Sequence, residues 1–216
     1  MIKPRDSGLS IAGARMELYG VASSRARRAL WALEEIGAEF TFHKIDLMKG
    51  EHRQPAYLAI NPNGKVPAFV DGDITLFESG AVCNYLALKY PQARLLPEPG
   101  SRDAALCQQW IFWVVSELEQ PLWNMAKHRF VLPEERRIPE MVDVALFEWQ
   151  QPSGILAEHL ADRDFMVGDA FTLADIFVAH TLNWARGAKV DLPSPASEAY
   201  LDRMLARPAY QRTLEY

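Results

Sequence analysis

The stretch from Leu18 to Gly37, LYGVASSRARRALWALEEIG, constrains the fold most, because a strand, a turn and a helix follow one another without a gap. The short apolar segment 16–19 predicts a strand that breaks at Gly20. Beyond the turn, apolar residues recur at the spacing of one helix face, at Ala26, Ala29, Leu30 and Leu33. Gly37 ends this pattern, as glycine often does just past a helix C-terminus. The stretch therefore predicts a β-turn-α unit.

The turn of this unit places Ser23 and Ser24 at the mouth of the predicted helix. Two interpretations are open at this point. One serine can cap the helix, which is a common role for serine at this position. Alternatively, the free backbone N–H groups and the positive end of the helix dipole can bind an anion. Capping is the more frequent of the two.

The segments that follow complete a small α/β domain. Alternating apolar and polar residues predict a second strand over 39–45, and a loosely patterned short helix follows over 48–59. The cluster Asn-Pro-Asn-Gly at 61–64 predicts a turn before an extended segment up to Val70. A tight turn at 71–73 leads into a strand over 74–77, and a helix runs from Glu78 to about Lys89. The order βαβαββα implies a mixed four-stranded sheet covered by helices.

The second half of the chain is helical in pattern. We expect a leader or an added extension over 1–15, an α/β domain over 16–92, a linker over 93–100 and an all-helical domain over 101–216. The expected helices cover 101–129, 134–162, 172–184, 197–205 and 208–216. Pro121 predicts a kink in the first of these, and Pro152-Ser153-Gly154 predicts an interruption of the second.

Thr172-x-x-Asp175 precedes an apolar stripe and has the spacing of a capping box. A carboxylate beside a hydroxyl is also found in acid–base catalysis. The spacing accounts for the pair as a helix start, so we interpret it as a folding element.

Composition excludes several classes of function. The 216 residues are 49% hydrophobic and 24% charged, as in ordinary soluble proteins, and the net charge of −5 argues against a nucleic-acid partner. No apolar run approaches the roughly 18 residues that span a bilayer. The two cysteines, Cys83 and Cys107, make no disulfide framework, and the five scattered histidines predict no metal site. We expect a cytoplasmic protein.

Four motifs in register then resemble the cytosolic glutathione transferase superfamily, in its serine-type, phi-, theta- and beta-like bacterial and plant members. They are YGVASSRARRALWALEEIG, NPNGKVPAFVDG, LFESGAVCNYLA and VGDAFTLADI. The resemblance extends from about Met16 to the C-terminus. It implies a thioredoxin-like N-terminal domain, an all-α C-terminal domain, glutathione as co-substrate, no metal, and a homodimer.

The resemblance also implies a glutathione site. The Val66–Pro67 bond would be cis, with the Val66 backbone pairing with the cysteinyl residue as an added strand would. Glu78 and Ser79 would hold the γ-glutamyl end. His52 and Lys65, with Arg53 as a weaker helper, match positions that neutralise the glycine carboxylate.

Ser23 matches the catalytic serine of serine-type members, with Ser24 as the alternative if the turn is shifted by one residue. Its hydroxyl would donate a hydrogen bond to the glutathione thiolate rather than attack, because the motif holds no His-Asp pair to activate it. The absence of cysteine at 23 or 24 disfavours thiol-transferase-like members. Arg25 and Glu78 depart from the pattern of the maleylacetoacetate isomerase branch.

The thiolate would attack a hydrophobic electrophile bound between the domains, by conjugation, peroxide reduction or dehalogenation. Aromatic and apolar residues that could line that space are Trp110, Trp113, Trp123, Met125 and Phe130, although such residues more often form core. The alternative is a non-catalytic binding or regulatory protein on the same fold.

Overall fold

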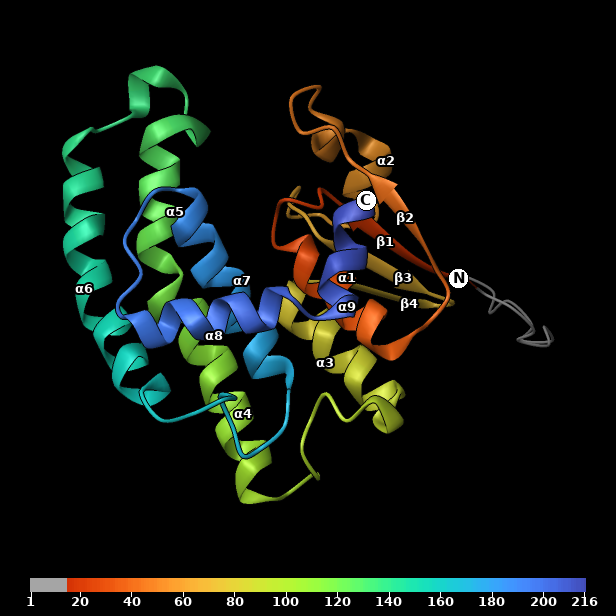
Figure 1. The fold of residues 1–216 in the computed structure, drawn as a ribbon. Helices are drawn as coiled ribbons and strands as arrows, with labels where there is room; N and C mark the ends of the chain where they lie inside the picture. The colour runs from red at the N-terminus through yellow and green to blue at the C-terminus, as the bar shows by residue number, and fades with distance from the viewer. Residues whose placement is uncertain (1–14) are drawn as a thin grey trace.

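The computed structural model describes residues 15–216, so the expected leader over 1–15 lies outside the described residues except for Arg15. Figure 1 shows an α/β domain beside a larger helical domain. The elements of the α/β domain are β1 (Met16–Gly20), α1 (Ala26–Ile36), β2 (Phe40–Lys44), η1 (Glu51–Arg53), α2 (Pro55–Leu58), β3 (Ala68–Asp71), β4 (Ile74–Phe77), α3 (Ser79–Lys89) and η2 (Pro91–Ala93).

The four strands form one mixed sheet in the order β2-β1-β3-β4. β1 runs parallel to β2 and antiparallel to β3, and β3 runs antiparallel to β4. The parallel pair requires a crossover, which α1 provides, whereas β3 and β4 are joined by the tight turn at Gly72. The predicted βαβαββα order is confirmed, with each strand within one or two residues of its expected bounds.

The helical domain follows. Its elements are α4 (Arg102–Trp113), the π-turn η3 (Val114–Leu118), α5 (Gln120–Ala126), the π-turn η4 (Lys127–Val131), η5 (Glu134–Arg136), α6 (Glu140–Leu160), α7 (Leu173–Gly187), α8 (Pro195–Leu205), α9 (Pro208–Arg212) and η6 (Thr213–Glu215). None of the helices in residues 15–216 combines the length and the apolar content that crossing a membrane requires.

The long helix expected over 101–129 is interrupted by a π-turn rather than by a simple proline kink. Pro121 has no N–H to give to a carbonyl one turn earlier. The chain widens just before it, so that the Glu119 N–H donates to the Val114 oxygen at 2.9 Å, five residues back. This turn brings Glu119 to a buried place where α4 passes into α5.

The break predicted at Pro152 is wrong, because α6 continues through it. Buried residues lie on both sides of the proline, at Trp149, Leu156 and Leu160, and their packing holds the helix together across the lost hydrogen bond. The helix expected over 48–59 is a 3₁₀ turn and a single α-turn, since Gly50 adopts φ +71° before it.

Helix α1 lies where the two domains meet. Its buried residues Leu30 and Leu33 belong to the same core as Leu18 of the sheet, and Trp31 packs against Phe171 and Tyr210 of the helical domain. Figure 1 shows α9 and the C-terminus returning to α1. The capping box is also confirmed: the Asp175 carboxylate accepts the Thr172 N–H at 2.8 Å and starts α7 beside α1.

Candidate active site

The register of the sheet brings the predicted site segments to one end of it. Tyr19 of β1 pairs with Ala68 of β3, which pairs with Phe77 of β4. The turn after β1, the segment before β3 and the segment after β4 therefore lie side by side. Gly20 pairs with Lys44 of β2, so the 45–53 segment leaves from the same end. Ser23, Val66-Pro67, Glu78-Ser79 and His52 belong to these four segments.

The turn between β1 and α1 distinguishes its two serines. The Ser24 hydroxyl donates to the Val21 oxygen at 2.7 Å and accepts the Ala26 N–H at 3.1 Å, so it caps the start of α1. Ser23 is exposed, and its hydroxyl has no hydrogen bond within residues 15–216. The backbone N–H groups of residues 22, 23 and 25 also have no acceptor there. These free donors make the turn suitable for an anion.

The Val66–Pro67 peptide bond is cis, as the resemblance implies. The preceding Lys65 oxygen accepts the Tyr57 hydroxyl and the Asn61 amide, each at 2.6 Å. By contrast, the N–H and C=O of Val66 have no hydrogen bond within the described chain. One residue at the end of the sheet therefore presents both backbone groups to a ligand.

Helix α3 begins at Ser79 beside this segment. Ser79 is buried, and the backbone N–H groups of its first turn point out of the helix without acceptors in the described residues. Glu78 precedes it with φ +70°, a conformation that costs a non-glycine residue about 1–3 kcal/mol and is concentrated at ligand sites. The exposed Glu78 carboxylate and the α3 N-terminus thus stand next to one another.

The three residues expected to supply positive charge differ in state. The Arg53 Nε donates to the His52 Nε2 at 3.2 Å, and burial together with the Arg53 charge lowers the pKa of His52 below its ordinary value. His52 is therefore a neutral imidazole at pH 7, with a buried Nδ1 that has no partner in the described chain. The His52 oxygen approaches Gly64, the neighbour of the exposed Lys65. The cations of this group are Lys65 and Arg53.

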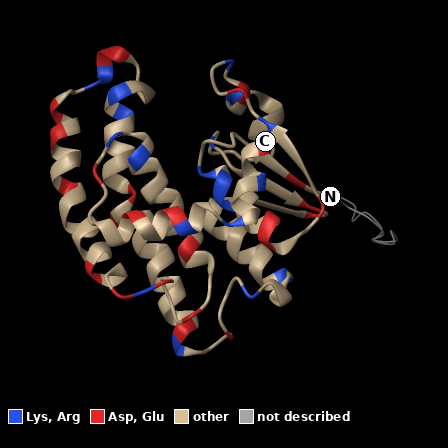
Figure 2. Ribbon diagram, viewed as in Figure 1, with Lys and Arg blue, Asp and Glu red and all other residues tan. Residues whose placement is uncertain are grey.

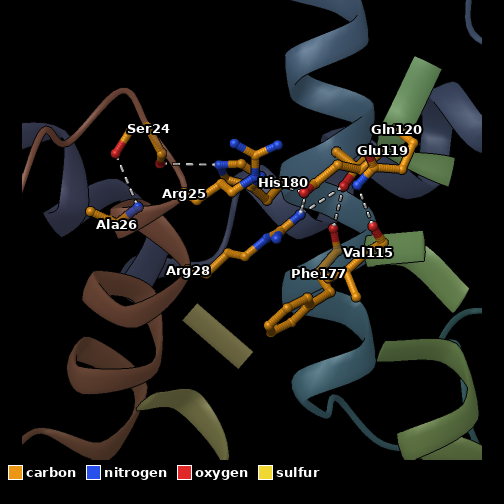
Figure 3. Close-up of polar contacts among 10 residues, drawn as sticks. Ser24, Arg25, Ala26, Arg28, Val115, Glu119, Gln120, Phe177 and His180 are labelled. Carbon is orange, nitrogen blue, oxygen red and sulfur yellow. Dashed lines mark hydrogen bonds and ion pairs between the residues drawn. The ribbon is translucent and has the colours of Figure 1, made fainter. Parts of the chain in front are cut away.

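A buried ionic cluster joins the serine turn to the helical domain (Figure 3). Arg25 Nε donates to one Glu119 oxygen at 2.6 Å, and Arg28 binds the other. Arg28 is fully buried and also donates to the Thr181 hydroxyl of α7 at 3.0 Å. Burial alone would raise the pKa of Glu119, but the charges of Arg28 and Arg25 outweigh it and lower that pKa. Glu119 is therefore ionised at pH 7.

His180 of α7 completes the contact. Its Nε2 lies 3.2 Å from the Ser24 oxygen, and because a carbonyl accepts, Nε2 carries the proton. Burial, followed by the charge of Arg28, holds the pKa of His180 well below its usual value, so the ring is neutral. The serine turn is thus held from the helical domain by one hydrogen bond and one ion pair.

The residues expected to line an electrophile site differ in their contacts and burial. Trp123 packs over Arg25, whereas Trp110 packs against Trp113 and His159. Met125 is buried and Phe130 is exposed. Trp110 borders a surface hollow of about 710 Å³, which none of the four site segments lines. Of the five residues, only Trp123 stands next to the serine turn.

Sequence reasoning missed Arg25, Glu119 and His180 as parts of this site. Arg25 and Arg28 are three residues apart, on the side of α1 that also carries buried alanines. Arginines on an otherwise apolar helix face could have indicated a buried ionic contact.

Both cysteines are buried, and burial raises the pKa of Cys83 to about 12. Neither serves as a reactive thiolate. Within residues 15–216, no three His, Cys, Asp or Glu side chains gather as metal ligands do.

The chain thus belongs to the class of two-domain proteins in which a thioredoxin-like domain is followed by an all-helical domain. Residues 14–88 match the family model described as "Glutathione S-transferase, N-terminal domain", and residues 121–208 match "Glutathione S-transferase, C-terminal domain". The chain belongs to the glutathione S-transferase family.

Individual relatives agree with this assignment. The chain is 32% identical to glutathione S-transferase F9 of Arabidopsis thaliana over 92% of this chain and 96% of that protein. It is 31% identical to the disulfide-bond oxidoreductase YfcG of Escherichia coli, over 92% and 94%. A theta class glutathione S-transferase from Xanthomonas axonopodis pv. citri, solved with glutathione bound, is 30% identical with a TM-score of 0.81, over 93% and 97%.

Proposed function

We propose that the protein is a glutathione transferase that activates the glutathione thiol as a thiolate for attack on hydrophobic electrophiles, and that it acts in their detoxification. The observation that carries the proposal is the turn after β1, where an exposed Ser23 hydroxyl and three backbone N–H groups have no hydrogen-bond partner among residues 15–216. The family and its glutathione-bound relative support the choice of glutathione as co-substrate.

Ser23 is the proposed thiolate donor. The Ser24 hydroxyl already donates its hydrogen to the Val21 oxygen, which favours Ser23 as the thiolate donor. A free thiol titrates near about 8.5. Each unit by which the turn lowers the pKa of the glutathione thiol favours the thiolate by about 1.4 kcal/mol. The bound thiolate then attacks an electrophilic carbon or a peroxide oxygen.

Three anchors would hold the tripeptide so that its sulfur faces this turn. The free N–H and C=O of Val66 pair with the cysteinyl backbone, next to Pro67. Ser79 and the α3 N-terminus bind the γ-glutamyl carboxylate, and Glu78 pairs with its ammonium. Lys65 and Arg53 neutralise the glycine carboxylate, and the neutral His52 positions Arg53 by accepting its Nε–H.

Substitution of each serine tests the proposal. We expect Ser23→Ala to lower kcat for conjugation of a chloronitroaromatic by about 10- to 1,000-fold while the KM for glutathione changes little, the pattern of an interaction made with the thiolate. Ser24→Ala serves as the matched control, since it removes a helix cap and should lower stability more than turnover.

Two results would count against this assignment. Full activity in Ser23→Ala with loss in Ser24→Ala would move the thiolate contact to Ser24. Failure of the wild-type protein to bind immobilised glutathione and to turn over any electrophile would favour a non-catalytic binding role.

Reduction of a disulfide is the second candidate, because one relative is named a disulfide-bond oxidoreductase. The buried Cys83 and Cys107 would supply no protein thiolate, so glutathione itself would attack the disulfide sulfur. The same thiolate site serves both reactions. Rates with a chloronitroaromatic, a hydroperoxide and a small disulfide, measured side by side, separate conjugation, peroxidase and reductase chemistry.

We further propose a cytoplasmic homodimer with an α/β domain over 16–92, a linker over 93–100 and a helical domain over 101–216. Large apolar side chains are exposed at Phe77 of β4, Leu88 of α3 and Phe112 of α4. The Gln108–Asn84 hydrogen bond of 2.7 Å joins α4 to α3, so Leu88 and Phe112 lie on neighbouring helices. A solution mass near twice that of the 24.4 kDa chain would support the dimer. The cytoplasmic location is supported by Cys83 and Cys107, which are buried and form no disulfide, as is usual in a reducing compartment.

A further inference from the structure

Arg25, at the end of the serine turn, makes contacts beyond those needed to link the turn to the helical domain. Its guanidinium carbon lies 5.0 Å from the ring centre of Trp123 and 5.0 Å from that of Trp184. Its Nε is fixed to Glu119 at 2.6 Å. The aromatic rings and the carboxylate together hold the planar group in one orientation.

The outer edge of this guanidinium is open. Neither terminal nitrogen has a hydrogen bond to another residue of the described chain (Figure 3). The side chain is 28% exposed, and neither nitrogen is among the fully buried polar atoms without partners, which is consistent with an edge that solvent reaches. Two parallel N–H donors on one accessible edge match the two oxygens of a carboxylate.

The charges around Arg25 do not balance. Two guanidinium groups, of Arg25 and Arg28, face the single carboxylate of Glu119, and His180 beside them is neutral. Figure 2 shows the basic residues at the start of α1, where it meets the helical domain. One positive charge is left over, and the open edge of Arg25 is the part of the cluster that a ligand can reach. An anion bound there would restore neutrality in a partly dry site.

We propose that Arg25 binds a carboxylate of the second substrate, so that the enzyme prefers electrophiles carrying an acidic group close to the reacting carbon. The inference rests on the proposed transferase function. Arg25 follows directly after the two serines, and its side chain contacts Glu119, Trp123 and Trp184 of the helical domain. The substrate's carboxylate would therefore lie on the side of the thiolate that faces the helical domain.

A matched pair of substrates tests the proposal. 4-Chloro-3-nitrobenzoate and its methyl ester undergo the same reaction: the thiolate attacks the carbon that bears chlorine, the C–S bond forms, the C–Cl bond breaks and chloride leaves with the electron pair. Only the benzoate carries the anion. We expect Arg25→Gln to lower kcat/KM for the benzoate by about 10- to 100-fold more than for the ester, mainly through KM.

Two further variants keep the test sharp. Arg25→Lys retains the charge without the paired donors, and should lie between wild type and Arg25→Gln. Arg27→Gln is the matched control: Arg27 is two residues along the chain but donates to Thr213, and its loss should leave the ratio of the two substrates unchanged. Because both substrates are measured with the same preparation of each variant, partial misfolding lowers both rates equally and leaves their ratio unchanged.

Equal losses on benzoate and ester in Arg25→Gln would overturn the proposal, and would make Arg25 a structural or thiolate-stabilising residue. A rise in the KM for glutathione without a change in the substrate ratio would also overturn it, since Arg25 would then bind the tripeptide. A wild-type protein that conjugates neither substrate would contradict the preference for acidic electrophiles, and the transferase function fails only if the protein also neither binds immobilised glutathione nor turns over any other electrophile.

Discussion

At the scale of single residues, Glu119 is the counter-ion of both arginines at the domain junction. It lies 94 positions from Arg25 in the sequence, almost fully buried, with one oxygen on Arg25 and the other on Arg28. Arg28 has no exposure to water, and its Nε and one terminal nitrogen have no partner in the described residues. The Glu119 carboxylate is what makes burial of that guanidinium tolerable.

We expect Glu119→Gln to reduce the free energy of unfolding by about 3–5 kcal/mol, because it leaves the buried Arg28 charge without its counter-ion. Urea unfolding followed by tryptophan fluorescence measures this loss. Glu117→Gln, two residues away and exposed, is the control and should change stability by less than about 0.5 kcal/mol.

The same residue gives a pH dependence with a definite sign. The pKa of Glu119 in the folded protein lies below its ordinary value of 4.5, so the unfolded chain binds the extra proton as the pH falls. The stabilisation by Glu119 is complete above pH 4.5 and is lost progressively below it. The stability difference between wild type and Glu119→Gln should therefore shrink in acid, and a constant difference would contradict this role.

The cluster also marks what the sequence could not predict. Ser23, His52, Lys65, Val66-Pro67 and Glu78-Ser79 lie within local motifs, so their places could be predicted from short stretches. Arg25 meets Glu119 and Trp184 only through packing of α1 against α5 and α7. No local sequence pattern predicts such a contact between distant segments. The position of an arginine in the sequence also does not show whether its side chain is solvated or buried.

At the scale of elements, the junction of β1 and α1 sets the shape of the serine turn. A Cβ built on Gly20 would lie 2.4 Å from the Cβ of Ala26, which no real pair of such atoms tolerates. The strand end and the helix start therefore touch, and only glycine allows the turn to be this tight.

We expect Gly20→Ala to push the first turn of α1 outward, lowering stability by about 1–3 kcal/mol and turnover by more than about tenfold. Thermal unfolding and conjugation kinetics measure the two effects. Gly154→Ala in α6 is the control: a Cβ there meets open space, and stability should stay equal or rise slightly. Unchanged turnover in Gly20→Ala would show that the turn tolerates displacement.

The same scale separates the elements that could be predicted from those that could not. The strands and α1 have clear periodicity with glycine or proline at their ends, and their predicted bounds hold to within about two residues. The helices around Pro121 and Pro152 differ from expectation in opposite directions. Each proline removes one backbone hydrogen bond. Packing on both sides of Pro152 keeps α6 continuous, whereas the chain before Pro121 forms a π-turn.

At the scale of the whole molecule, the helical domain is part of the site rather than a cover beside it. His180 and Glu119 hold the serine turn from one side, and the register of the sheet brings the proposed glutathione anchors to it from the other. The Glu35–Arg207 and Glu34–Arg212 ion pairs fix the far end of α1 to the C-terminal helices. Contacts with both domains thus define the position of α1, and with it the proposed place of the glutathione sulfur.

Titration of the thiol of bound glutathione tests the central claim most directly. The ultraviolet absorbance of the thiolate is followed against pH in the wild-type complex and in Ser23→Ala. We expect a thiol pKa at least about one unit below the ordinary value of about 8.5 in the wild type, and a return toward that value in Ser23→Ala. An ordinary thiol pKa in the wild-type complex, or the same lowered pKa in both proteins, would contradict it.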